Sequence, residues 1–162
     1  MALYGAQLYR SNKNETDINY DVIGETSSVV AVGDLLTATD SNVINVIGST
    51  TDYVLGVAAG AVTAAQNDGT KRVPYIPADL DTVWLMGTNS ALTDDTTDYG
   101  TFYAITGGTG AQQVNVSGNV TTTTSRQVMI VKVDPNKVGG TDGLKQCLVK
   151  FVRIPQFNGA FN

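Results

Sequence analysis

The sequence predicts an all-β fold, a small antiparallel β-sandwich or β-barrel-like domain with extended terminal arms. Charged residues make up 15% of the chain, against about 25% in an average globular domain. Thr, Val, Gly and Asn are abundant instead, a mixture that favours strands joined by tight turns. Short β-branched segments recur at close spacing, and no long window keeps the apolar spacing of a helix.

The 162 residues are enough for one domain with a core of its own. We expect a single β-domain at 27–153, an N-terminal arm with a first strand at 1–26, and a C-terminal tail at 154–162. The strand candidates lie at 29–32, 35–39, 43–47, 53–59, 72–76, 82–86, 101–106, 112–116, 127–133 and 145–153. Their number and spacing are typical of a sandwich or barrel.

The stretch SSVVAVGDLLTATDSNVINV, residues 27–46, predicts a hairpin. Its arms are LLTA and VINV, and the four residues between them are good turn formers. Asp34 and Asp40 fall where turns need them, so we interpret both as turn residues. The next segment, YVLGVAAGAV, is apolar on both faces and predicts a central strand, in which Gly56 and Gly60 suit bulges or close backbone approach.

A second, longer hairpin is expected near the C-terminus, where QVMIVKV and KQCLVKFVRI flank a turn-rich insert. Strand alternation puts one apolar set on each arm. These sets are Met129, Val131 and Val133 in the first arm and Cys147, Val149 and Phe151 in the second. The opposite face is also partly apolar, which indicates either an internal strand or a partner subunit. Residues 93–125, by contrast, are expected to be loops too polar and small to fill a core.

The residue types argue against an enzyme. The chain has no histidine, which excludes Ser-His-Asp and Cys-His arrangements and the H-E-x-x-H metal site. The single cysteine, Cys147, lies in an apolar strand and is expected to be a buried packing residue. No catalytic set and no cofactor are predicted.

A glycosidase needs two carboxylates across a cleft, and a calcium ion takes oxygen ligands from a loop, so the acidic residues of this chain are candidates for either role or for plain turns. The candidate acids lie beside proline, threonine or glycine, which favours turns; they are Asp79, Asp81, Asp94, Asp95 and Asp98. TDDTTDYG at 93–100 lacks the EF-hand spacing, and no metal site is predicted. GGTGAQQ at 107–113 lacks the Gly-Lys-Ser/Thr ending of a phosphate loop.

The net charge of −5 disfavours direct nucleic-acid binding. Lys71 and Arg72 are interpreted as a solvated strand end. No apolar run is long enough to cross a membrane, and MALYGAQLYRSNKN is not a secretory signal, so cytoplasmic synthesis is expected.

The aromatic residues leave one alternative open. Trp84, between Val83 and Leu85, is expected in the core. Tyr75, Tyr99, Phe102 and Tyr103 could instead stack on sugar rings, as in a carbohydrate-binding module.

The order of three segments resembles the capsid decoration, or head auxiliary, proteins of tailed bacteriophages. These segments are SSVVAVGDLLTATDSNVINV, then DYVLGVAAGAV, then KRVPYIPADLDTVWLMG, and the likeness covers roughly residues 27–105. In that group a Gly-Asp turn precedes a short hairpin, a G-V-A segment follows, and later strands close a small β-domain.

The resemblance implies a structural virion protein, often a homotrimer, that binds the outside of the phage head and staples neighbouring subunits of the major capsid protein. Its place would be the outer surface of the virion head. The family's attachment motif has no counterpart here, so candidate contacts are chosen by chemistry, within 1–11 and 154–162. They are Leu3, Tyr4, Leu8, Tyr9, Ile154, Phe157 and Phe161. The alternative is a receptor- or carbohydrate-binding head or tail fibre domain.

Overall fold

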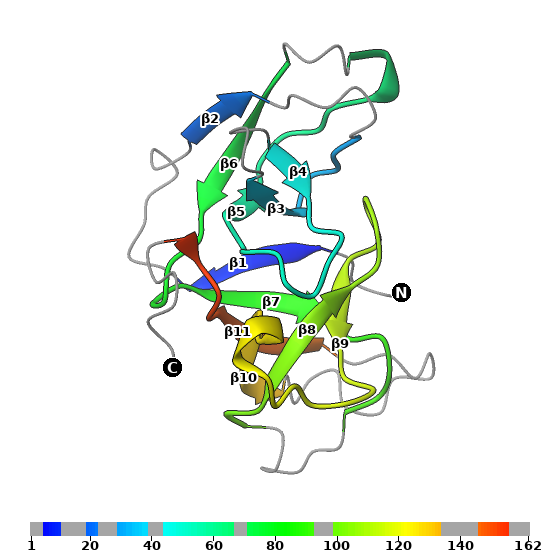
Figure 1. Ribbon diagram of the computed structural model, residues 1–162. Helices are drawn as coiled ribbons and strands as arrows, with labels where there is room; N and C mark the ends of the chain where they lie inside the picture. Colours follow the sequence, from blue (N-terminus) through cyan, green and yellow to red (C-terminus); the bar gives the residue numbers. More distant parts are fainter. Residues whose placement is uncertain are drawn as a thin grey trace.

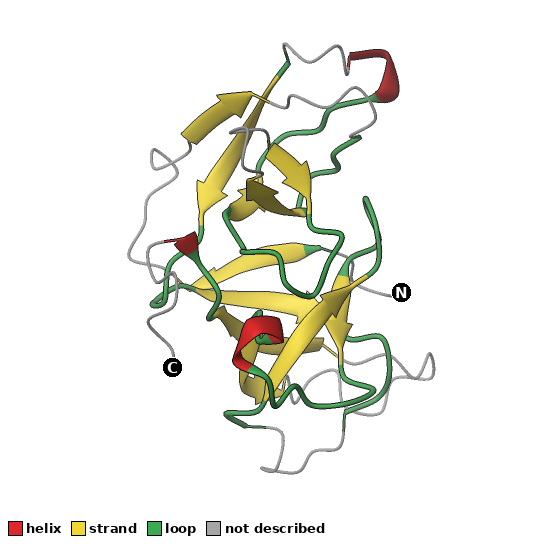
Figure 2. Ribbon diagram, viewed as in Figure 1, coloured by secondary structure: helices red, strands yellow, loops and turns green. Residues whose placement is uncertain are grey.

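A computed structural model describes residues 5–10, 19–22, 29–38, 44–66, 71–92, 99–133 and 146–155. Two antiparallel sheets make up the fold, one above the other in the view of Figure 1. Strands and loops account for nearly all of the described chain (Figure 2), and the named helices are two short 3₁₀ turns, η2 (Ala64–Gln66) and η4 (Thr123–Ser125). The predicted all-β class is therefore confirmed.

The first sheet has six strands and curls on itself. In spatial order they are β1 (Ala6–Arg10), β7 (Val83–Gly87), β11 (Gln146–Phe151), β10 (Val128–Val133), β8 (Phe102–Thr106) and β9 (Gln113–Asn115). A parallel bridge joins Thr88, just after β7, to Val114 in β9. Because this bridge brings β9 back towards β7, the sheet forms a half-barrel.

The second sheet has five strands. In spatial order they are β2 (Asn19–Val22), β6 (Arg72–Pro77), β5 (Gly56–Ala58), β3 (Leu35–Ala38) and β4 (Ile44–Val46). The predicted hairpin is present, with Leu36 of β3 opposite Val46 of β4. Its connection, with Asp40, lies outside the described residues.

The position of β5 also agrees with the sequence. It lies between β3 and β6, as expected of a strand that is apolar on both faces. A Cβ added to Gly56 would meet the Ile76 carbonyl and the Tyr75 ring, and one added to Gly60 would meet the Pro74 ring. Both glycines therefore serve close approach between β5 and β6.

The main core fills the space between the sheets. Its largest fully buried side chains include Trp84 and Phe151, whose ring centroids lie 5.3 Å apart. Cys147 is buried in the same cluster, as predicted. Leu35 and Val57, from the five-stranded sheet, also belong to this cluster, so the two sheets share this core.

Two expectations about the six-stranded sheet need correction. Val131 is an extra residue at a register shift in β10, so the core-facing set is Val128, Ile130 and Val133 rather than Met129, Val131 and Val133. The stretch 93–125 is also more than loops. It contains β8 and β9, and it supplies Tyr103, Ile105 and Val114 to the core.

We predict that Gly56→Ala lowers the free energy of unfolding by about 1–3 kcal/mol, because the new Cβ overlaps β6 main chain. Gly118→Ala is the matched control, since a Cβ there meets nothing within 4 Å. It should change stability by less than about 1 kcal/mol. Urea unfolding of both variants tests this; equal effects would refute the close-approach interpretation.

Candidate interaction edge and the joint that positions it

Asp34 links the two sheets where they meet. Its side chain is 1% exposed. One carboxylate oxygen accepts the Ala31 N–H at 2.8 Å and so closes the turn that leads into β3. The other accepts the Gly110 N–H, also at 2.8 Å, from the β8–β9 loop of the other sheet. Asp34 is thus a turn residue, as expected, and a long-range contact as well.

The glycine loop between β8 and β9 is shaped to reach that turn. Gly107 and Gly110 have φ angles of 91° and 68°, which favour glycine. The Thr109 hydroxyl donates to the Val29 carbonyl at 2.9 Å, beside the Asp34 contact. The GGTG motif therefore has a structural role, holding the β8–β9 loop against residues 29–34.

The start of β1 is bonded to the same turn. Ala6 N–H donates to the Gly33 carbonyl, and Gly5 N–H donates to the Gln112 carbonyl, each at 2.8 Å. Gly5 and Gly33 both have positive φ, at 71° and 91°. A Cβ on Gly5 would lie 2.6 Å from the Gly33 carbonyl oxygen, so the approach requires glycine.

Gln112 is a fully buried connector. Its Oε1 accepts the Leu35 N–H at 2.5 Å, and its Nε2 donates to the Ile47 carbonyl at 3.2 Å. Leu35 opens β3, and Ile47 follows β4. One side chain next to β9 therefore satisfies main-chain groups of two neighbouring strands in the other sheet.

Gln127 makes a second connection of the same kind. Its Oε1 accepts the Ile105 N–H at 2.8 Å, and its Nε2 donates to the carbonyls of Ser49 and Asp52 at 3.0 Å each. The loop after β4 is thereby fastened to β8 and β10. We call Asp34, Gln112 and Gln127 together the joint.

Burial sets the charge preference of Asp34. It raises the pKa of this carboxyl above its ordinary value, and the N–H groups of Ala31 and Gly110 partly oppose that shift. The folded protein therefore holds the Asp34 proton more tightly than the unfolded chain does.

The joint leaves β1 as one edge of the six-stranded sheet. β1 pairs with β7 on one side. On its other side the Gly33 carbonyl accepts the Ala6 N–H. By strand alternation the N–H and C=O of Leu8 point to this same side of β1, and no described residue pairs with them there. Leu8 and Tyr9 are 45% and 61% exposed, and Val32, next to Gly33, is 66% exposed. We call these three residues the N-terminal edge.

The candidate contact residues fall into three groups. Leu8 and Tyr9 lie exposed on β1. Ile154 is 1% exposed and packs in the main core, so its assignment as a partner contact is corrected to a packing residue. The others lie outside the described residues, and they are Leu3, Tyr4, Phe157 and Phe161.

The acidic candidates contribute to turns where they are described. Asp79 Oδ1 accepts the N–H groups of Asp81 and Thr82, and its Oδ2 accepts the Thr82 hydroxyl. Asp94, Asp95 and Asp98 lie outside the described residues. Within the described ranges, no group of three or more acidic or cysteine side chains is placed to hold a metal ion.

The aromatic side chains offer little surface for sugar stacking. Trp84, Tyr75 and Tyr103 are at most 5% exposed. Phe102 lies under the Arg126 guanidinium, 4.5 Å from the ring centroid. Tyr99 is the exposed member of the set, at 42%.

The joint glutamines were missed from sequence. They are the first residues of the strand candidates 112–116 and 127–133, and that position carries no local mark of a contact more than sixty residues away. No helix in the described chain has the length and apolar character to cross a membrane. Comparison with family models, curated proteins and solved structures gives no match.

We predict that Gln112→Leu lowers the free energy of unfolding by about 2–6 kcal/mol. The substitution leaves the Leu35 N–H and the Ile47 carbonyl buried without their partner, at about 1–3 kcal/mol for each group. Gln66→Leu, on the exposed turn η2, is the control and should cost less than about 0.5 kcal/mol. Denaturant unfolding gives both values, and a Gln112→Leu protein as stable as the control would exclude the connector role.

The raised pKa of Asp34 predicts a pH dependence with a definite sign. Its contribution to the free energy of unfolding is greatest below the unfolded pKa, near 3.8, and is lost as pH rises through the folded-state pKa. The difference in stability between wild type and Asp34→Asn isolates this group. The difference should shift in favour of Asp34→Asn as pH rises above 3.8. A difference that moves the other way contradicts the desolvation account.

Proposed function

We propose that this protein is a structural component of a tailed-phage virion, which binds the exterior of the head as a homotrimer and stabilises contacts between major capsid subunits. The order of segments that resembles decoration proteins supports this proposal. The observation that carries it is the N-terminal edge, because Leu8, Tyr9 and Val32 expose apolar surface where, among the described residues, no strand pairs with the outer side of β1 at Leu8.

The edge suits attachment to another protein for two physical reasons. Outward N–H and C=O groups at Leu8 can add a strand from a partner, and this mode of binding gives main-chain hydrogen bonds as well as side-chain pockets. Large exposed side chains such as Tyr9 are the kind that dominate binding energy once buried.

The mechanism follows from linkage. Each subunit needs only modest contacts, since a trimer presents three edges at high effective concentration. A protein that binds the assembled shell and not its separated subunits raises shell stability by mass action. The receptor- or sugar-binding alternative gains less support, because most of its expected aromatic platform is buried.

We predict that Leu8→Ser with Tyr9→Ser weakens binding to heads lacking the protein by about tenfold or more, or about 1.4 kcal/mol. Co-sedimentation with such heads measures this. Ala65→Ser, on the exposed turn η2, is the control and should bind normally.

Two results would count against the proposal. One is unchanged co-sedimentation of the double variant, which would remove the edge as the contact. The other is density at the tail and none on the head lattice when particles with and without the protein are imaged. Tests of the C-terminal tail should delete 156–162 and keep Ile154, because that residue belongs to the core.

A further inference from the structure

The overall charge constrains how copies of this protein can meet. The chain carries −5, so two copies repel each other across most pairs of surfaces. A self-contact is favoured where one surface locally reverses that sign. The six-stranded sheet has such a surface.

This surface, the β10 patch, is set by strand register. Met129 lies opposite Lys150 of β11 on one side and opposite Phe102 of β8 on the other. Lys132 lies opposite Leu148, two residues from Lys150, and so on the same face. All of these side chains point away from the core set Val128, Ile130 and Val133.

Apolar groups fill the spaces between the cations. Val131 is the extra residue of the bulge and is 38% exposed. Tyr99 is 42% exposed, and its neighbour Gly100 donates to the Ile130 carbonyl at 2.8 Å, which places Tyr99 beside this part of β10. Met129 and Phe102 are half-buried. An apolar centre with charges around it is the usual anatomy of a protein interface.

Among the residues that the structure describes, the charged side chains of the patch all have one sign. They come from Lys132, Lys150 and Arg126, the last stacked over Phe102. None of the described acidic side chains forms an ion pair with the two lysines. Removing these three cations from the total of −5 leaves −8 on the rest of the chain. A second copy therefore offers a strongly acidic remainder to a basic patch.

We propose that the β10 patch is where one copy of the protein binds the acidic surface of a second copy. The inference names a contact for the oligomer proposed above and rests on that oligomer, not on head binding. β7 and β11 separate β1 from β10, so roughly 14 Å lies between those two strands, and Lys150 on β11 is one strand closer to β1. Self-association and attachment through the N-terminal edge can therefore occur together.

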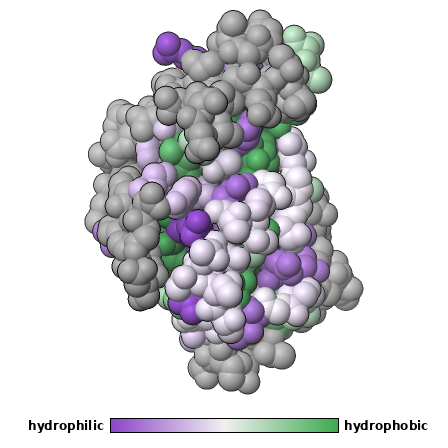
Figure 3. Space-filling model, in the orientation of Figure 1, coloured by the Kyte–Doolittle hydropathy of each residue, from purple (hydrophilic) through white to green (hydrophobic). Residues whose placement is uncertain are grey.

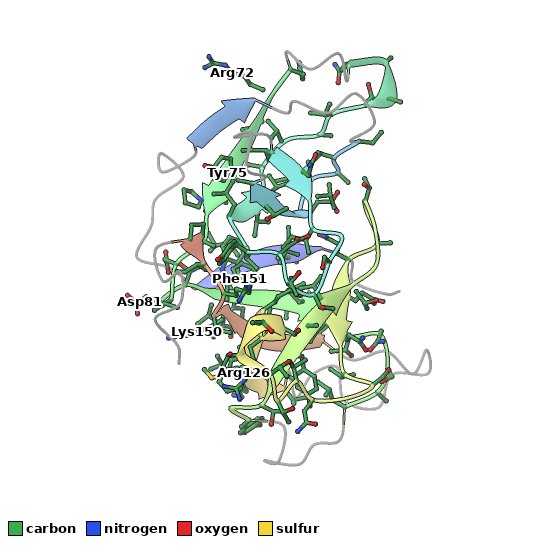
Figure 4. All side chains as sticks on the ribbon, in the orientation of Figure 1. Arg72, Tyr75, Asp81, Arg126, Lys150 and Phe151 are labelled. Carbon is green, nitrogen blue, oxygen red and sulfur yellow. The ribbon has the colours of Figure 1, made fainter. Side chains whose placement is uncertain are left out.

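The test is sedimentation velocity of the full chain from about 1 to about 100 μM, at about 0.05 and about 0.5 M NaCl. The test variant is Lys132→Glu with Lys150→Glu. The matched control is Lys71→Glu with Arg72→Glu, which makes the same charge change at exposed residues of the other sheet. Figure 4 shows Lys150 and Arg126 on the six-stranded sheet and Arg72 at the far end of the molecule.

The wild type should be oligomeric at low salt, and its self-association should weaken as the salt concentration rises. The Lys132/Lys150 variant should bind itself at least about tenfold more weakly, and the control should match the wild type. If the glutamate variant unfolds, Lys132→Gln with Lys150→Gln gives a second test in which the two positive charges are removed but not reversed. The salt series on the wild type tests the same contact without any substitution.

A wild type that stays monomeric, or a control that dissociates as much as the test variant, overturns the inference. So does a shift of the wild type by a short DNA duplex that the lysine variant abolishes, because the patch would then serve nucleic acid. Co-sedimentation with heads separates the two proposals. A monomer that still binds heads removes the patch and the homotrimer but leaves head attachment standing, and an oligomer that fails to bind heads removes head attachment alone.

Discussion

The fold depends on hydrogen bonds from three buried side chains to main-chain groups across the gap between two sheets. Asp34, Gln112 and Gln127 are each at most 1% exposed. Together they satisfy main-chain groups that neither sheet pairs internally, among them the amides of Leu35 and Ile105. A buried main-chain group without a partner costs about 1–3 kcal/mol, so these contacts decide whether the two sheets can close over one core.

The joint also determines what the surface presents. The Gly33 carbonyl accepts the Ala6 N–H at the start of β1, and Asp34 closes the adjoining turn. Further along the same strand, Leu8 and Tyr9 are exposed. On the side drawn in Figure 3 the described surface is mainly pale, with small green and purple areas, and it has no broad apolar patch. The exposed large apolar side chains of β1 and β10 are Leu8, Tyr9 and Val131.

Sequence reasoning succeeded where structure is local. The hairpin of β3 and β4, the central strand β5 and the pairing of β10 with β11 follow from alternation and turn residues. It failed where one residue alters register, as at Val131, and where a side chain bonds far along the chain. Asp34 was interpreted as a turn residue, and its turn contact with Ala31 agrees. Its bond to Gly110 links residues 76 positions apart, and such contacts leave no periodic mark.

Native-state hydrogen exchange tests the joint most directly. The amides of Leu35 and Ile105 donate to Gln112 and Gln127, and neither is part of an unbroken ladder that would protect it alone. If the joint holds the sheets together, both amides exchange only on global unfolding, with the same free energy as the Val149 amide in the core of β11. Exchange of Leu35 and Ile105 through a local opening well below that free energy would contradict the account.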